Sequence, residues 1–424
     1  MKINKHCFPN GLRLVHYEDT STQMVALNIV YDVGARDEHP EHTGFAHLFE
    51  HLMFGGSAHI PDYDTPLQLA GGENNAWTNN DITNYYLTVP KPNVETAFWL
   101  ESDRMLELAF SEQSLEVQRG VVMEEFKQRC LNQPYGDVGH LFRPLAFRVH
   151  PYRWPTIGKE LSHIEQATLD EVKSFFYRFY APNNAVLAVT GNISWDETVK
   201  LTEKWFAPIP RRDVPVRQLP QEPEQTQERR LTVERNVPLD ALFMGYHMCS
   251  REGADYYAFD ILSDILSNGR SSRLNRRLVQ EQNIFSGIDA YISGTRDAGL
   301  LQISGKPAAG VSLEQAEAAV RKELEELQRS PVDGQELEKV KNKFESTQIF
   351  GNINYLNVAT NLAWFELTGK AEDIDLEVER YRSVTTEQLH TVAQRTFCES
   401  NAVVLYYKSC LLYTSPSPRD VEES

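Results

Sequence analysis

Two stretches of this sequence resemble each other: Thr168-Leu169-Asp170-Glu171-Val172 and Thr385-Thr386-Glu387-Gln388-Leu389. Each opens with a threonine that an acidic side chain follows two or three residues later, which is typical of a helix N-terminus. The first leads to an apolar run at residues 184–187 and the second to one at residues 401–404. Both runs favour a buried strand. The offset is constant, because 385 − 168 and 401 − 184 both equal 217.

A second pair of elements recurs in the same order. Residues 85–89 read as a strand before a helix at 94–108, and residues 300–304 read as a strand before a helix at 313–327. The matches together indicate a duplicated half built of strands and helices. Between the copies, residues 208–223 contain five prolines, which continue neither a helix nor a central strand. We therefore expect a linker here, between domains at 1–214 and 215–408.

The end of the chain differs from the repeats. Residues 409–424 extend past the last repeated strand and include Tyr413-Thr414-Ser415-Pro416-Ser417-Pro418-Arg419-Asp420. This stretch looks like translated sequencing-adapter read-through, so we expect a non-native tail and leave it out of the fold. Where the native C-terminus lies stays open.

Composition excludes several classes of protein. With 41% hydrophobic and 24% charged residues and a net charge of −18, the chain has the composition of a globular protein that repels nucleic acid and anionic membranes. Five scattered cysteines form neither a disulfide framework nor a cysteine metal site. Since neither a signal nor an arginine-rich transit peptide is recognisable, we expect a cytoplasmic protein, bacterial rather than organellar.

The segment His47-Leu48-Phe49-Glu50-His51 is the strongest chemical signal. It lies in a short apolar helix, for which Thr43 is a candidate N-cap and Gly55-Gly56 a stop. Histidines four residues apart share a helix face and suit a zinc site. Glu50, close to that face, is placed to take a proton from the attacking water. The alternative is an amphipathic helix with idle surface histidines, which the apolar neighbours disfavour because they indicate a buried helix.

A catalytic zinc requires a third protein ligand and an open position. The best donor is in a helix at residues 114–126, whose last turn contains Glu124 and Glu125. These two point about 100° apart on a helix, so one of them is a solvated carboxylate. Spacing alone leaves both open.

At this point the sequence resembles the inverted-motif zinc peptidases, the family of pitrilysin, insulin-degrading enzyme and mitochondrial processing peptidase, over residues 3–408. It is most similar to the short bacterial two-domain members. Besides His47–His51, the resemblance rests on four other stretches: Asn75-Ala76-Trp77-Thr78, Thr83-Asn84-Tyr85-Tyr86, Arg119-Gly120-Val121-Val122-Met123-Glu124-Glu125, and Tyr180-Ala181-Pro182-Asn183-Asn184 with Gly191-Asn192. It implies an α+β fold of two homologous half-domains. Each would be a mainly antiparallel sheet flanked by helices.

The resemblance also implies roles for single residues. Glu125 falls at the family's third-ligand position, which gives one Zn²⁺ per chain. Asn75 and Ala76 fall where the family pairs an extended peptide with an edge strand. Phe54 and Trp77 match apolar residues that line a substrate pocket, although ordinary core packing is an alternative for both.

Two departures from the family pattern stand out. Gln118 occupies a position that usually holds a glutamate assisting catalysis. We expect this exchange to tune catalysis and not to abolish it, because an amide can still hydrogen-bond a metal ligand. Self-sufficient members place an arginine and a tyrosine in the second half, where this chain has Val279 and Ser286. Arg277 and Tyr291 lie nearby, but their spacing differs.

These observations predict a zinc metalloendopeptidase that cleaves short or unfolded peptides. Val279 and Ser286 suggest the catalytic subunit of a heterodimer whose homologous partner supplies the arginine and tyrosine; a homodimer is also possible. The main alternative is a non-catalytic structural or regulatory subunit, and a weaker one is a zinc hydrolase of another kind. The physiological substrate and the partner stay open.

Overall fold

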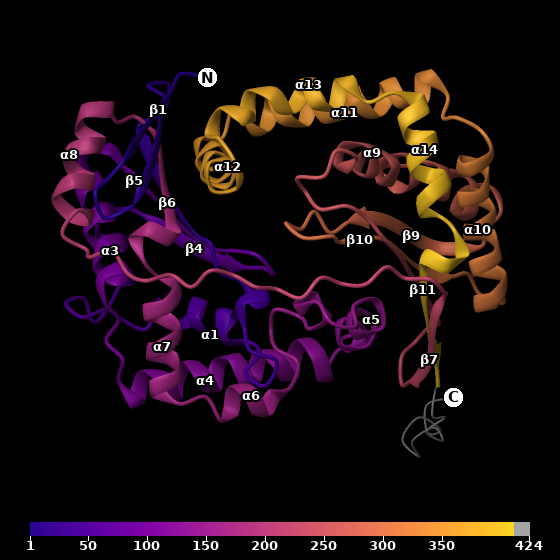
Figure 1. The fold of residues 1–424 in the computed structure, drawn as a ribbon, viewed down its shortest axis with the longest axis horizontal. Coiled ribbons are helices and arrows are strands. Elements are labelled where there is room, and N and C mark those ends of the chain that lie inside the picture. The colour runs from indigo at the N-terminus through magenta and orange to yellow at the C-terminus, as the bar shows by residue number, and fades with distance from the viewer. Residues whose placement is uncertain (411–424) are drawn as a thin grey trace, which may run out of the picture. The chain divides into compact units, whose positions relative to one another are not determined.

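The computed structural model describes residues 1–410 and groups them into two compact units (Figure 1). Unit 1 contains residues 1–131, 149–222 and 342–382. Unit 2 contains residues 132–148, 223–341 and 383–410. The expected boundary near residue 215 separates two halves of the chain, whereas each compact unit also includes a segment from the other half.

Unit 1 is built on a six-stranded sheet with the strand order β1-β2-β6-β3-β5-β4. β2 and β6 are parallel, and every other neighbouring pair is antiparallel. The strands are β1 (Ile3–Cys7), β2 (Arg13–Glu18), β3 (Met24–Tyr31), β4 (Glu73–Thr78), β5 (Thr83–Pro90) and β6 (Ala185–Gly191). The helices that begin in this unit are α1 (Phe45–Leu52), α2 (Asp64–Leu69), α3 (Val94–Leu106), α4 (Glu112–Phe126), α6 (Leu161–Glu165), α7 (Leu169–Phe179), α8 (Trp195–Phe206), α12 (Tyr355–Thr368) and α13 (Glu377–Ser383).

Both faces of this sheet are buried. One face packs against α1, α3 and α7 in a large apolar core that includes Leu27, Tyr85 and Leu187. The other face carries Ala26, Val186 and their neighbours, which pack against α12. Central strands buried on both sides read as continuous apolar runs, and all seven residues of β6 are buried accordingly.

Unit 2 contains a five-stranded sheet with the order β7-β11-β8-β10-β9. Its strands are β7 (Arg229–Arg235), β8 (Ala241–His247), β9 (Phe285–Ile292), β10 (Leu300–Pro307) and β11 (Ala402–Ser409). Its helices include α5 (Val138–Ala146), α9 (Tyr256–Ser267), α10 (Leu313–Arg329) and α14 (Thr386–Thr396), and α11 (Gly334–Gly351) begins in it. β7 and β11 are parallel and the other pairs antiparallel.

The two sheets confirm the predicted duplication and the mainly antiparallel pairing. The order β7-β11-β8-β10-β9 repeats β2-β6-β3-β5-β4. The starts of β3 and β8, of β5 and β10, and of β6 and β11 all differ by 217 residues, since 241 − 24, 300 − 83 and 402 − 185 have that value. The predicted helix starts are also confirmed, because Thr168 and Thr385 accept N–H bonds as the N-caps of α7 and α14.

Two helices explain why the units are not contiguous halves. α5 and α12 begin 217 residues apart, at Val138 and Tyr355. α5 comes from the first half of the chain but packs on β7 and β8 of unit 2. α12 comes from the second half but covers β3 and β6 of unit 1. Equivalent helices of the two halves are therefore exchanged between the units.

The expected linker and the start of the expected tail can both be located. Residues 208–223, the proline-rich segment, form neither helix nor strand. β11 continues through Ser409, whose N–H donates to Asp240 Oδ1 at 2.7 Å. The expectation that the tail begins at residue 409 is therefore wrong, because Ser409 belongs to β11 and the Cys410 N–H donates to the Arg235 carbonyl oxygen at 2.8 Å. Residues 411–424 of the expected tail lie outside the described residues. Within residues 1–410 no helix is both long and apolar enough to cross a bilayer.

Glu317 of α10 is the buried centre of an ion-pair network in unit 2 whose two arginines are partly exposed. Its carboxylate accepts bonds from Arg230 at 2.7 and 2.8 Å, from Arg321 at 2.7 Å and from Tyr406 Oη at 2.5 Å. Burial by itself would raise the pKa of Glu317, but these bonds lower the pKa to about 2. The folded state thus favours the ionised carboxylate.

Glu317→Gln is expected to destabilise the protein by on the order of 1–2 kcal/mol at pH 7, because it removes a buried carboxylate charge from two arginines that solvent partly screens. A depressed folded-state pKa adds stability above the pKa of an unfolded glutamate, about 4.3, and that stability is lost as pH falls towards 2. The difference in melting temperature between the wild type and Glu317→Gln should therefore become smaller below about pH 4. Glu325→Gln, on an exposed position of the same helix, is the matched control. An undiminished difference at pH 3 would contradict this account.

Candidate metal centre

The helix α1 presents the predicted motif from a buried segment. Phe45, Leu48, Phe49 and Leu52 are buried in the core of unit 1. The prediction that Thr43 caps this helix is wrong. The N-cap is Gly44, with a φ of 89° that favours glycine, and the Thr43 hydroxyl instead accepts the Lys159 N–H at 2.8 Å.

The cap comes from an upstream residue. The two carboxylate oxygens of Glu38 accept the N–H groups of Gly44 and Ala46, each at 2.9 Å. Free N–H groups in the first turn of a helix require such partners. Glu38 therefore performs the role that the sequence assigned to Thr43.

Three predicted ligands meet at one point. One donor atom each from His47, His51 and Glu125 lies within 4.8 Å of the other two. The Glu125 Oε2 atom is 3.6 Å from His47 Nε2 and 3.3 Å from His51 Nε2. Donors bound at about 2.1 Å to one tetrahedral ion lie roughly 3.4 Å apart, so this donor set fits zinc.

The structure distinguishes between the two adjacent glutamates. Glu125 contacts both histidines, and its side chain is 19% exposed. Glu124 is 56% exposed and lies near Lys127. Arg129 also approaches Glu125 Oε1 at 2.9 Å, and the hydrogen bond to His51 lowers the pKa of Glu125. The carboxylate is therefore held in its ionised, metal-binding form.

The electrostatics of α1 also suit a metal centre. Burial lowers the pKa of His47 to about 4, so the imidazole stays neutral, as a metal ligand must be. Burial raises the pKa of Glu50, while a hydrogen bond to Thr78 opposes the shift. Thr78 is the last residue of β4, so this edge strand contacts Glu50, the predicted general base.

β4 lies at the edge of the sheet beside α1. Asn75 is exposed and Ala76 half-buried. The Ala76 N–H donates to Asn75 Oδ1 at 2.8 Å. An edge strand offers backbone N–H and C=O groups to an added strand, so these residues are placed where an extended peptide would pair.

Phe54 and Trp77 do not lie on one face. Phe54 packs with Tyr63 and Tyr85 at ring distances of 5.7 and 6.1 Å, on the α1 side of the sheet. Ala76 pairs with Tyr85 and shares that side. Trp77, 37% exposed, is next along β4 and points to the opposite face. A single pocket lined by both aromatic residues is therefore not formed in unit 1.

The positions that depart from the family pattern are also located. Gln118 is half-buried on α4. Val279 lies in a π-helical segment, Asn275–Glu281, and Ser286 lies in β9, where its hydroxyl donates to Lys306 O at 3.1 Å. Arg277 pairs with Glu323 at 2.6 Å and also with Glu326, so its charge is already engaged by α10. Tyr291, on β9, is 48% exposed.

Unit 2 does not repeat the metal centre. The offset of 217 places Asp264, Ser267 and Asn268 where unit 1 has His47, Glu50 and His51. Asn268 donates to Asp264 at 2.7 Å. Among residues 1–410, one group of three possible metal donors is found, and it is the group in unit 1.

The sequence analysis assigned no role at this site to three residues that contact its helices or side chains. Glu38 caps α1, Thr78 contacts Glu50, and Arg129 pairs with Glu125. Arg129 carried a signal, since it follows Glu125 by four residues on one helix face. Glu38 and Thr78 carried none, because their contacts depend on how the chain folds back onto α1.

Comparison with known proteins is consistent with this geometry. The sequence profile of insulinase, peptidase family M16, matches residues 13–137, and the profile of the peptidase M16 inactive domain matches residues 166–344. The zinc protease PqqE of Helicobacter pylori is 26% identical over 405 residues, covering 94% of this chain and 91% of that protein. The uncharacterized zinc protease YmxG of Bacillus subtilis is 25% identical, covering 95% and 98%.

Solved structures share the fold. A protease from Helicobacter pylori superposes with a TM-score of 0.91 at 26% identity, covering 96% of this chain and 99% of that one. A peptidase M16 inactive domain from Pseudomonas fluorescens gives a TM-score of 0.88 at 16% identity, covering 97% and 99%, and so shows the fold alone.

The two glutamates on α4 provide a test of the ligand set. Glu125→Gln should abolish stoichiometric zinc binding, because a neutral amide is a poor zinc ligand. Glu124→Gln should retain about one zinc per chain. Zinc content after dialysis, measured by atomic emission, decides between them. Equal zinc content in the two variants would exclude Glu125 as the third ligand.

Proposed function

Because this chain belongs to the insulinase family of peptidases, M16, we propose that it is a zinc metalloendopeptidase acting on short or unfolded peptides. The observation that carries the proposal is the meeting of His47, His51 and Glu125, whose donor atoms lie within 4.8 Å of one another. Glu50 lies beside them on the same helix. This combination is what hydrolysis of a peptide bond requires.

The chain's own side chains would hold the metal. His47 and His51 would supply nitrogen donors and Glu125 an anionic oxygen, oriented by Arg129. Zinc held there supplies a Lewis acid that makes water acidic enough to lose a proton near neutral pH.

Glu50 is proposed to move the proton. Its carboxylate takes the proton from the attacking water and passes it to the leaving amine. Burial raises the pKa of Glu50, which brings a carboxylate closer to the working pH of a general base. The hydrogen bond to Thr78 holds the carboxylate towards the edge strand.

Peptides are proposed to bind as an added strand along β4. Main-chain bonds hold an extended segment of any sequence in register, so selectivity depends on side-chain pockets. Asn75 and Ala76 line this edge. A short or unfolded peptide exposes its backbone for such pairing without first unfolding, which favours substrates of this kind.

The chain is further proposed to work as the catalytic subunit of a heterodimer. Val279 and Ser286 occupy the positions of an arginine and a tyrosine, and the ion pairs of Arg277 with α10 oppose its use as a substitute. A homologous partner would supply that pair. A non-catalytic subunit is the second candidate, favoured by the same two positions but opposed by the complete set His47, Glu50, His51 and Glu125. A cytoplasmic location stays a prediction from the sequence.

Glu50→Gln tests the chemistry. Zinc-loaded wild type should cleave fluorogenic peptides in a chelator-sensitive way, and the variant should lose at least about 10³-fold in kcat while retaining zinc. Full cleavage by wild type alone as a monomer or homodimer would exclude an obligatory heterodimer. Zinc binding without cleavage calls for adding a homologue that lacks the zinc motif, and no cleavage even then would favour the non-catalytic subunit.

Ala76→Pro tests binding on the edge strand. Proline removes one backbone N–H at the edge, so kcat/KM for peptides should fall about ten-fold. Zinc content and the melting temperature should stay near those of the wild type, since proline is tolerated on edge strands. Unchanged kcat/KM for every peptide would exclude pairing at this position.

A further inference from the structure

The first part of the connection between β3 and α1, residues 32–38, carries the cap of the metal-binding helix, and we call it the 32–38 loop. It contains the short 3₁₀ turn Ala35–Asp37 and ends at Glu38, which is 7% exposed. Glu38 accepts the first N–H groups of α1 from Gly44 and Ala46. The orientation of α1 therefore depends on where this loop holds the Glu38 carboxylate.

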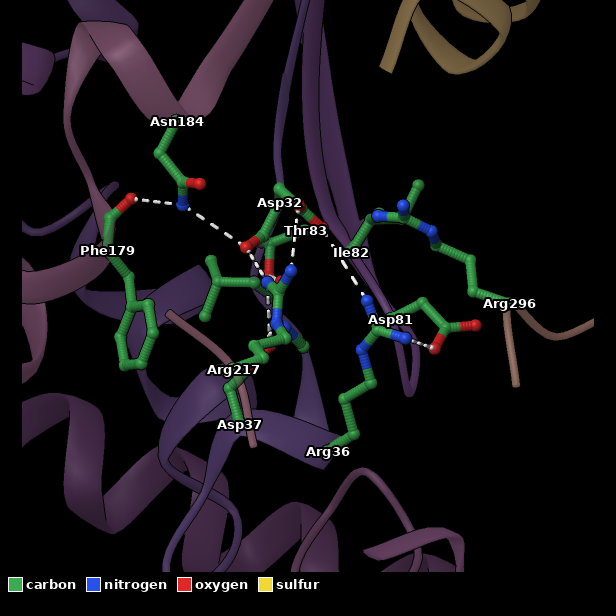
Figure 2. A network of polar contacts seen from close by, with 12 residues as sticks. Asp32, Arg36, Asp37, Asp81, Ile82, Thr83, Phe179, Asn184, Arg217 and Arg296 are labelled. Atoms are coloured by element: carbon green, nitrogen blue, oxygen red, sulfur yellow. Dashed lines mark hydrogen bonds and ion pairs between the residues drawn. The ribbon is translucent and has the colours of Figure 1, made fainter. Parts of the chain in front are cut away.

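One linker residue contacts both ends of this loop. Arg217 donates to the Asp32 carboxylate at 2.8 Å and also to the Asp32 carbonyl oxygen. The same guanidinium donates to both carboxylate oxygens of Asp37, one of them at 3.2 Å. Figure 2 shows Arg217 between these two aspartates, with Arg36 reaching Asp81 beside them. A planar fork with several donors suits this double contact.

The contacts of Arg217 involve a buried charge. The Asp37 side chain is 2% exposed, and its Oδ2 also accepts the Gly34 N–H at 3.0 Å. Glu38 is the next residue, so two carboxyl groups are buried side by side. Arg36 is shared with Asp81 at 3.2 Å. Without Arg217, Asp37 would lose its closest cation, and an uncompensated buried charge is costly enough to displace the loop.

The linker leaves space beside this loop. Val216 is 88% exposed, and a cavity of about 270 Å³ is lined by residues of the linker and of the loop, including the half-buried Leu219. The hydrogen bonds and ion pairs of Arg217 are the polar connection between the two segments.

We propose that Arg217 is a positioning residue: by clamping both ends of the 32–38 loop, it holds Glu38 against the N-terminus of α1 and so orients the helix that carries His47, Glu50 and His51. The proline-rich linker then serves the metal centre as well as joining the two halves of the chain. The functional meaning of this clamp rests on the proposed function, whereas its structural effect can be tested without metal or peptide.

The test is hydrogen–deuterium exchange of the full-length, metal-free protein, followed by mass spectrometry of fragments covering α1 and α8. Arg217→Gln should make α1 exchange about ten-fold faster and leave α8 unchanged, because a lost cap opens one helix locally. Arg217→Lys keeps the charge without the fork and should show a smaller increase. Arg211→Gln is the matched control, since Arg211 is an exposed arginine of the same linker.

A double variant tests the route through Glu38. If Arg217 acts by placing Glu38, Arg217→Gln adds less than about two-fold to the exchange of α1 in a Glu38→Gln background. The proposal is overturned by unchanged exchange of α1 in Arg217→Gln, by equal increases in α1 and α8, or by additive effects in the double variant. Should Arg217→Gln not fold, Arg217→Lys is compared in the same way. These experiments measure hydrogen exchange and not peptidase activity. A failure of the proposed function would therefore appear in the activity assays and not in these measurements.

Discussion

Burial of both faces of the six-stranded sheet is the constraint on which unit 1 depends. A sheet with apolar side chains on both sides requires cover on both sides. α1, α3 and α7 cover one face, and α12 from the far end of the chain covers the other. Because the equivalent helix α5 packs in unit 2, each half of the sequence completes the core that the other half forms.

The metal centre uses this packing to bring polar groups together. α1 is fixed on the sheet by Phe45, Leu48 and Phe49, and α4 packs beside it. Because α1 and α4 are packed side by side, they can hold His47, His51 and Glu125 at separations of a few ångströms. Polar partners then restrain the donors, since Arg129 contacts Glu125 and Thr78 contacts Glu50.

Duplication separates the tasks of the two halves. The same strand order occurs twice, but α9 carries Asp264, Ser267 and Asn268 where α1 carries the motif. The second half has the buried apolar residues that a sheet needs, such as Leu242, Leu301 and Leu405. It supplies α12 to unit 1, so it contributes to the stability of the metal-bearing unit without a metal cluster among its own described residues.

The sequence by itself determined the duplicated halves, the starts of α7 and α14, and the pair His47 and His51, because periodicity and capping are local properties of the chain. Glu125 was identified by resemblance, since spacing on α4 left Glu124 open. Only the tertiary structure decided that Glu38 rather than Thr43 caps α1, that Trp77 faces away from Phe54, and that α5 and α12 are exchanged. Each of these depends on contacts between segments distant in the sequence, or on which face of a strand packs on the core. The local sequence pattern specifies neither the contacts nor the face.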